Sequence, residues 1–180
     1  TATRLVADAE ETTREITEAA EQRNTSAVSY HFGSRQGLLR ELLARRGGPV
    51  DAERGRMLVA AGDAPDLPTL VRCLVVPYAA LLDDPAGRSY LRIVAQLRGR
   101  FAAWRVESDV ATSQHLAAIL DEIESRPDAP PAVRRERVVA LIMVLTASVA
   151  ERARRIDDGS GNDLTHDQFT DNLVAMCAAV

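Results

Sequence analysis

The sequence contains no lysine, few aromatic residues, only two cysteines and no long hydrophobic run. All 22 basic residues are arginines. The longest uncharged run, from Val138 to Ala150, is shorter than the roughly 20 residues that cross a bilayer. No basic segment followed by an apolar stretch opens the chain, so we expect no signal peptide, no membrane partner and a cytoplasmic location. Cys73 and Cys177 lie far apart in apolar segments, which predicts two buried thiols rather than a disulfide.

Sequence signatures of catalysis and metal binding are also missing. The chain has no HExxH, CxxC, ExxH or GxSxG motif. His115 and His166 are isolated, and Gly159-Ser160-Gly161 lacks the preceding strand and third glycine of a dinucleotide-binding loop. No nucleophile and base can be paired from their spacing. We therefore predict a protein that is not an enzyme and that needs no metal or cofactor.

The residues that are abundant favour helices. Apolar residues make up 46% of the chain, and alanine, leucine, valine, arginine and glutamate predominate. The pattern predicts an all-α protein in which Gly47-Gly48-Pro49 ends a helix and separates a headpiece, residues 1–46, from a body, residues 47–180. The helices expected in the body span residues 50–61, 67–84, 86–104, 108–125, 132–156 and 165–180, and Thr165 with Gln168 forms a capping box for the last.

The charge is distributed unevenly along the chain. The net charge is −4, which argues against general binding of polyanions. Residues 23–46, however, carry five arginines against the single acid Glu41, a local charge of +4. The sequence thus places a small basic patch on an acidic body.

Within the headpiece, two short helices joined by a tight turn indicate a helix-turn-helix. A capping box at Thr12 and Glu15 opens the first helix, and Asn24 or Thr25 caps the second. A helix that reads the major groove needs small polar side chains at its exposed start, and cations or hydroxyls beside it contact phosphates. Thr25, Ser26 and Ser29 are the predicted base contacts, and Thr13, Arg23, Tyr30, His31 and Arg35 complete the predicted DNA-binding set. The alternatives are a solvated helix face for the small residues and core packing for Tyr30 and His31.

These residues resemble the tetracycline-repressor (TetR) family of bacterial transcriptional regulators. The resemblance lies in residues 12–16, 24–32 and 33–39, and Tyr30-His31-Phe32-Gly33-Ser34-Arg35 is its most specific part. It implies a first helix of the motif at about 13–20, a recognition helix at about 24–31, and a link to the body from Ser34 to Arg46. It also implies a homodimer that binds a palindromic operator and releases it when a small molecule enters the body.

The chain departs from this family in two places. Gln22-Arg23 stands where the family turn carries a glycine and a small apolar residue. In addition, Glu10 is followed almost directly by the capping box, so that about ten residues of the family's first helix and loop are missing. We expect a break in the sequence near Ala9 to Thr12. Normal spacing of consecutive Cα atoms, about 3.8 Å, through residues 8–13 would refute this.

Pro77 points to a ligand site in the body. Within a helix, proline removes its own amide and deprives the Cys73 carbonyl of its partner, which kinks the axis. A kink in a bundle opens a cavity with apolar walls and a few polar anchors. The residues expected to line it are Tyr78, Gln96, Phe101, Trp104 and Met143. The alternative is ordinary core packing around a tolerated proline.

The helix at 132–156 is apolar nearly all round and needs cover on two sides. The rest of the body covers one side. A two-fold partner would cover the other, together with residues 165–180, as the family resemblance implies; burial in a larger monomeric core is the alternative.

The function expected is a sequence-specific transcriptional regulator, a repressor released by a small-molecule effector. The competing hypothesis is an all-α small-molecule-binding or enzymatic bundle without DNA binding.

Overall fold

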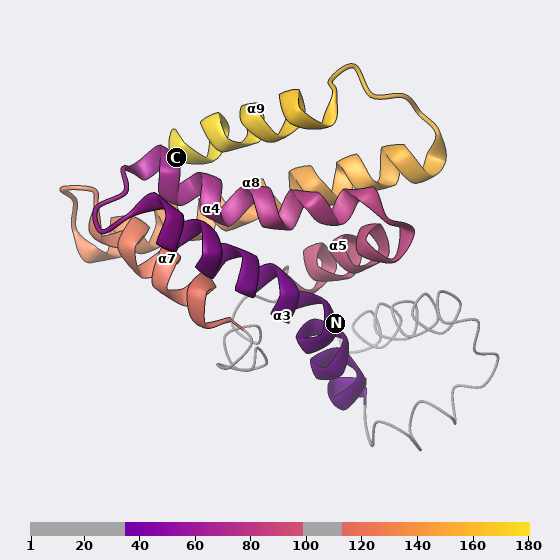
Figure 1. Cartoon of the computed structure of the whole chain (residues 1–180), viewed down its shortest axis with the longest axis horizontal. Helices are drawn as coiled ribbons and strands as arrows, with labels where there is room; N and C mark the ends of the chain where they lie inside the picture. The colour runs from indigo at the N-terminus through magenta and orange to yellow at the C-terminus, as the bar shows by residue number, and fades with distance from the viewer. Residues whose placement is uncertain (1–34, 99–112) are drawn as a thin grey trace, which may run out of the picture.

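The body of the protein is built from helices. The computed structural model describes residues 35–98 and 113–180, and these residues form helices and short connections with no strand among them. This confirms the predicted all-α class, whereas the predicted helix-turn-helix and the expected break near residues 9–12 lie outside the described residues. The elements, coloured along the chain in Figure 1, are α3 (Arg35–Ala61), α4 (Leu67–Ala79), the 3₁₀ helix η1 (Ala80–Asp83), α5 (Pro85–Arg98), α7 (Gln114–Ser125), α8 (Pro131–Asp158) and α9 (His166–Ala178).

Helix α3 runs without interruption through the predicted stop at Gly47-Gly48-Pro49, so that prediction was wrong. Contacts on both sides of Pro49 explain the difference. Before it, Arg46 pairs with Asp84 at 3.3 Å. After it, Val50 and Asp51 are buried in the body. Tertiary contacts of this kind override the weak helix propensity of glycine and the amide missing from proline.

Two aspartates cap the helices that follow α3. The Asp66 side chain accepts the amide of Thr69 and opens α4, and the Asp84 side chain accepts the amides of Ala86 and Gly87 at 2.8 and 3.0 Å and opens α5. The Gly87 amide, the Ala86 amide and Arg46 lower the pKa of the Asp84 carboxyl. Gly87 itself is required for close packing, because a Cβ there would lie 2.1 Å from the Leu81 carbonyl oxygen.

Pro77 lies inside α4, as predicted, but the helix does not continue to residue 84. The α-helix ends at Ala79, and residues 80–83 form the 3₁₀ helix η1. The change comes two residues after the proline, which itself lacks the amide that would bond to the Cys73 carbonyl. The predicted helix at 67–84 is therefore two helical segments of different type.

The last two helices follow the sequence signals closely. Helix α8 begins at Pro131, a favoured first position, and ends at Gly159, which adopts the left-handed conformation with φ 65°. The predicted capping box is confirmed: Thr165 accepts the Gln168 amide at 3.2 Å, and the Gln168 side chain accepts the Thr165 amide at 3.0 Å.

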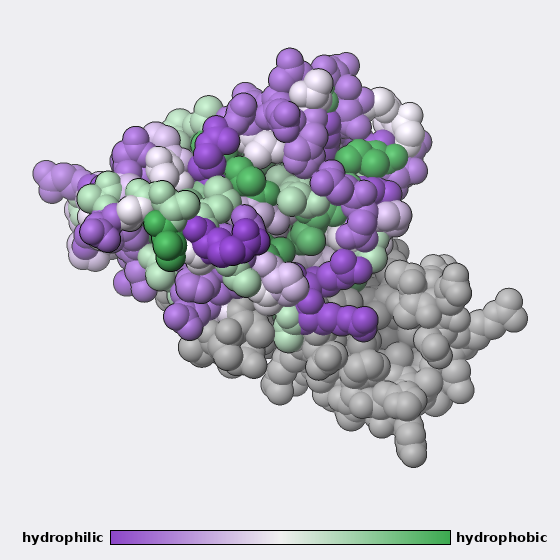
Figure 2. Space-filling model, viewed as in Figure 1, coloured by the Kyte–Doolittle hydropathy of each residue, from purple (hydrophilic) through white to green (hydrophobic). Residues whose placement is uncertain are grey.

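The core lies where α4 and α5 pack against α9 and α8, with α3 and α7 closing one side (Figure 1). The most deeply buried side chains come from all of these helices except α3 and include Leu74, Leu91, Ile119, Val149 and Leu173. Both cysteines are buried and free, as the sequence predicts, and burial raises the pKa of the Cys177 thiol to about 11. Hydrophilic residues cover much of the face drawn in Figure 2, and hydrophobic residues show between α3 and α9. None of the helices described is long and apolar enough to cross a membrane.

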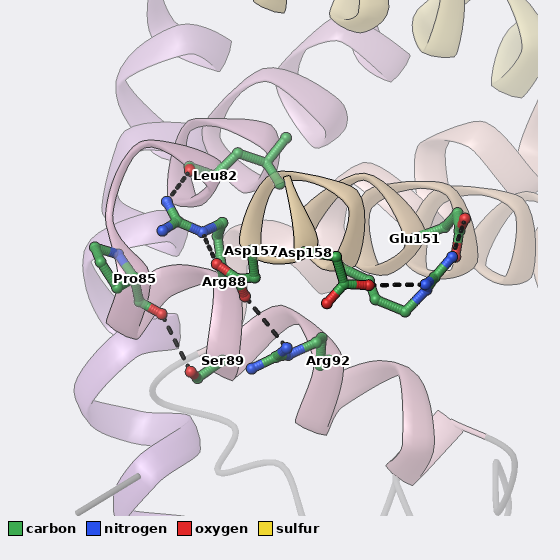
Figure 3. Close-up of polar contacts among 9 residues, drawn as sticks. Leu82, Pro85, Arg88, Ser89, Arg92, Glu151, Asp157 and Asp158 are labelled. Atoms are coloured by element: carbon green, nitrogen blue, oxygen red, sulfur yellow. Dashed lines mark hydrogen bonds and ion pairs between the residues drawn. The ribbon is translucent and has the colours of Figure 1, made fainter. Parts of the chain in front are cut away.

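Ion pairs connect α5 to the C-terminal end of α8. The Arg88 side chain donates to Asp157 at 2.5 Å and to the Leu82 carbonyl at 3.0 Å (Figure 3). Arg92, one turn further along α5, pairs with the same carboxylate at 3.2 Å. Asp157 therefore bridges two arginines and fixes the C-terminal end of α8 beside η1 and α5.

Candidate functional site

The predicted DNA-binding residues fall almost entirely outside the described part of the chain. Seven of them lie before residue 35. Arg35, the eighth, is the first residue of α3. Helix α3 is continuous from Arg35, the last residue of the predicted set, to Ala61, and it contacts the core at Val50.

Three of the five residues predicted to line a ligand cavity are described, and they differ in burial. Tyr78 is buried on α4, with 5% of its surface exposed. Gln96 is exposed on α5, and Met143 is exposed on α8 with 45% of its surface accessible. Met143 therefore faces outward rather than into the core of this chain. Phe101 and Trp104 lie outside the described residues, and the predicted cavity stays a prediction.

The structure instead brings polar groups together where α3 meets α4 and α7. Asp51 on α3 is buried, with 6% of its side chain exposed. Its two carboxylate oxygens accept the amides of His115 and Leu116 at 2.9 and 2.8 Å. These are two of the free amides at the N-terminus of α7, where a negative charge is favoured. Asp51 is thus a cap supplied to α7 by another helix.

Arg54 lies one turn after Asp51 and is equally buried, with 7% of its side chain exposed. Its Nη2 donates to the Leu74 carbonyl of α4 at 3.5 Å, and its Nη1 lies 3.8 Å from the Asp51 carboxylate. The second distance is longer than a hydrogen bond. The buried Nε has no hydrogen-bond partner. Burial lowers the pKa of the Arg54 guanidinium, and Asp51 opposes this shift.

Four helices contribute to the surroundings of Arg54. Tyr78 of α4 and Tyr90 of α5 lie close enough to act on its charge. His115 of α7 packs against Gly55, the residue next to Arg54, where a Cβ would lie 2.6 Å from the imidazole Nε2. Arg54 thus lies near two phenols, and an imidazole packs against the residue that follows it. We call Asp51, Arg54, Tyr78, Tyr90 and His115 the polar core.

Sequence reasoning missed Asp51 and Arg54, although a signal was present. Val50, Arg54 and Leu58 follow each other at spacings of four along α3, and the first and last are apolar. A charged residue at the middle position of such a stripe is predicted to be buried. Buried charges are rare unless they are paired or functional, so this position marks a candidate site.

A second candidate surface lies on α8 and α9. Met143 on α8 and Met176 on α9 are 45% and 46% exposed, and Val180, which follows α9, is 39% exposed. Ala140, Met143 and Ala147 recur on α8 at spacings of three and four, which places them on one uncharged face. Exposed apolar side chains that recur in this way are typical of a protein–protein contact.

Among the residues placed in the structure, no three histidine, cysteine or acidic side chains are grouped so as to hold a metal ion. No protein-family model and no curated protein matches the chain. The motif, the polar core and the surface of α8 and α9 are the features of this chain that bear on its function.

Proposed function

We propose that this chain is a sequence-specific DNA-binding transcriptional regulator, a repressor that acts in the cytoplasm as a homodimer and leaves its operator when a small molecule binds the body. The observation that carries the proposal is the segment from Arg23 to Arg35, which combines small polar residues, two phosphate donors and two arginines in a basic part of an acidic chain. The resemblance of this segment to the TetR family implies a DNA-binding headpiece followed by a body that binds the effector and forms the dimer.

The path of α3 supports the link between headpiece and body. This helix begins where the motif ends and reaches Asp51 and Arg54 in the polar core. A change at the polar core therefore acts on the same rigid element that follows the motif. An effector can release DNA only if it binds the two arrangements of α3 unequally.

The outer surface of α8 and α9 supports the dimer. Met143 and Met176 are large apolar side chains left exposed by the fold of one chain. A symmetric dimer would cover them with the same residues of a second copy. Two recognition helices on such a dimer would enter major grooves about 34–36 Å apart and read a pseudo-palindrome.

Selection from a random duplex library by the full chain tests the proposal. We expect a pseudo-palindromic site whose halves are one helical turn apart. Tyr30→Phe removes a phosphate donor and should weaken binding to every sequence alike, whereas Ser29→Ala should relax the preference at one base position. A library that yields no enriched site, or Tyr30→Phe acting at a single base position, would contradict these assignments. If the chain retains no duplex at low salt, the competing hypothesis holds instead, and the protein is an all-α small-molecule-binding or enzymatic bundle that does not bind DNA.

A further inference from the structure

Helix α3 is continuous at a point where its own sequence disfavours a helix. Glycine and proline are the two least favourable residues in a helix interior, and Gly47-Gly48-Pro49 places two glycines directly before a proline. Pro49 has no amide, so the usual helical hydrogen bond to the Arg45 carbonyl is missing. Prolines are also common positions for helix kinks. The continuity of α3 at residues 47–49 therefore depends on contacts with the rest of the body.

These contacts differ on the two sides of residues 47–49. After them, Val50 and Asp51 are buried, and Asp51 accepts two amides of α7 at 2.9 and 2.8 Å. Before them, Leu43 packs against the core from a partly buried position. Arg46 pairs with Asp84 while 38% of the arginine side chain stays exposed. The second part of α3 is thus fixed inside the body, whereas the first part is held at its surface.

Asp84 is oriented toward Arg46 by its role at the start of α5. Its Oδ1 accepts the amides of Ala86 and Gly87 at 2.8 and 3.0 Å, which fixes the carboxylate on the first turn of that helix. The other oxygen, Oδ2, accepts the Arg46 Nη1 at 3.3 Å. Because both capping bonds use Oδ1, the cap and the ion pair do not compete. One side chain therefore joins the N-terminus of α5 to α3.

Packing accounts for one of the two glycines but not for the other. A Cβ at Gly47 would lie 3.3 Å from the Tyr90 hydroxyl, which keeps this position small. A Cβ at Gly48 would have no atom within 4 Å, and its backbone does not adopt a positive φ. Pro49 beside it is exposed. Gly48 thus weakens the helix without allowing a closer contact, which is what a hinge requires.

We propose that residues 47–49 form a hinge in α3 and that the Arg46–Asp84 pair keeps this hinge closed. With the pair formed, α3 is one rigid helix as far as the polar core. With the pair broken, the part of α3 before Gly47 turns independently of the part after Pro49. An exposed ion pair shifts an equilibrium by only a few fold, so the hinge can open as well as close.

The consequence for regulation rests on the proposed function. A change in the body reaches the predicted DNA-binding residues through α3, and a rigid helix transmits such a change whereas a bent one does not. The Arg46–Asp84 pair therefore decides whether the body and the headpiece are coupled.

Hydrogen exchange of backbone amides, followed by NMR on the full chain without DNA, tests the hinge. In a continuous helix the amides of Gly47 and Gly48 bond to the carbonyls of Leu43 and Ala44, and opening of the hinge frees them. We expect Arg46→Met to speed exchange of these two amides by about 2- to 5-fold, the effect of losing an exposed ion pair. The amides of α7 that bond to Asp51 should exchange as in the wild type.

Two further variants separate the ion pair from a general effect of substitution. Asp84→Asn keeps an oxygen to cap α5 and removes the charge opposite Arg46, so it should speed exchange as much as Arg46→Met does. The two changes together should add little to either one alone. Arg45→Met is the matched control, because Arg45 is exposed and lies next to Arg46 on the same helix. It should leave the exchange of both glycine amides unchanged.

The variant Gly48→Ala/Pro49→Ala tests whether residues 47–49 are the hinge. It places good helix formers at both positions and returns the amide that bonds to the Arg45 carbonyl. Because this variant no longer bends easily, Arg46→Met added to it should not speed exchange at residues 47 and 48. An equal effect of Arg46→Met with and without these two alanines would overturn the hinge. So would an equal effect of Arg45→Met, or no effect of Arg46→Met on the wild type.

The exchange measurement and the proposed function fail independently of each other. No DNA is present, so a hinge that responds to Arg46→Met in a chain that retains no duplex would refute the proposed function alone. Duplex binding by a chain whose exchange at residues 47 and 48 ignores Arg46→Met would refute this inference alone.

Discussion

Asp51 and Arg54 lie one turn apart on α3 and are buried to the same extent, yet their bonding differs. Asp51 makes two short hydrogen bonds to the amides of α7, and Arg54 makes one long bond to α4. The sequence places Arg54 in an apolar stripe, between Val50 and Leu58, so its burial was predictable. The partner of Asp51 was not, because the free amides of α7 come from a helix more than sixty positions away.

Glu151 gives a prediction at the residue scale. Hydrogen bonds from Arg154 and Arg155 lower the pKa of its carboxyl from 4.5 to about 2. Because the folded protein holds the carboxylate in its charged form, this stabilisation is complete above pH 4.5 and is lost as the pH falls toward 2. We expect Glu151→Gln to be less stable than the wild type at pH 6 and equal to it near pH 2, as measured by urea unfolding across this range.

Glu136→Gln, on the exposed first part of the same helix, is the control for net charge. A stability difference between wild type and Glu151→Gln that stays constant from pH 6 to pH 2 would show that Glu151 contributes nothing through its charge.

At the scale of elements, the sequence predicts where most helices lie. The prediction of a helix end is wrong where contacts between residues distant in the sequence stabilise the helix. The caps at Asp66, Gly159 and Thr165 are local signals, and α4, α8 and α9 begin or end beside them. The failure is α3, which continues through Gly47-Gly48-Pro49. The contacts that hold it there, to Asp84 and to α7, become visible only once the chain is folded.

The two glycines of α3 at positions 48 and 55 allow a matched test. A Cβ at Gly48 would have no atom within 4 Å, whereas one at Gly55 would lie 2.6 Å from the His115 Nε2. We expect Gly48→Ala to stabilise the protein by roughly 0.5–1 kcal/mol, through helix propensity alone. Gly55→Ala should destabilise it by about 1 kcal/mol, because the His115 ring has to move.

Thermal or urea unfolding measures both effects. Adding His115→Ala to Gly55→Ala removes the obstructing ring and should recover part of the lost stability. If Gly48→Ala destabilises the protein as much as Gly55→Ala does, α3 is not a continuous helix at residue 48.

At the scale of the whole molecule, the apolar surface of α8 and α9 makes a prediction about assembly. Met143→Glu and Met176→Glu place charges on the surface proposed to join two copies, and an unpaired charge at such a contact is strongly unfavourable. We expect both variants to be monomers at concentrations where the wild type is a dimer, as measured by sedimentation equilibrium.

Val59→Glu is the matched control, because Val59 on α3 is 84% exposed and lies on a different helix. It should remain a dimer. A wild type that is monomeric at all concentrations, or a dimer broken equally by Val59→Glu, would exclude the surface of α8 and α9 as the interface.

The sequence predicts the fold class of the whole molecule but not which side of α8 faces outward. Hydrophobic periodicity predicted the all-α class, which the described residues confirm. It also placed Met143 in a cavity, although this residue faces outward. On a helix that is apolar nearly all round, periodicity does not separate the side facing the core from the side left for a partner.

The most direct test of the proposed function is the salt dependence of duplex binding by the full chain. A dimer that places Arg23 and Arg35 of each copy on phosphates should show a slope of log K against log salt concentration of about −3 to −4, and Arg23→Ala should reduce its magnitude by about 2. Binding to the selected site with these slopes is the result expected. Binding that is independent of salt, or no binding to any duplex at low salt, would contradict the DNA-binding function.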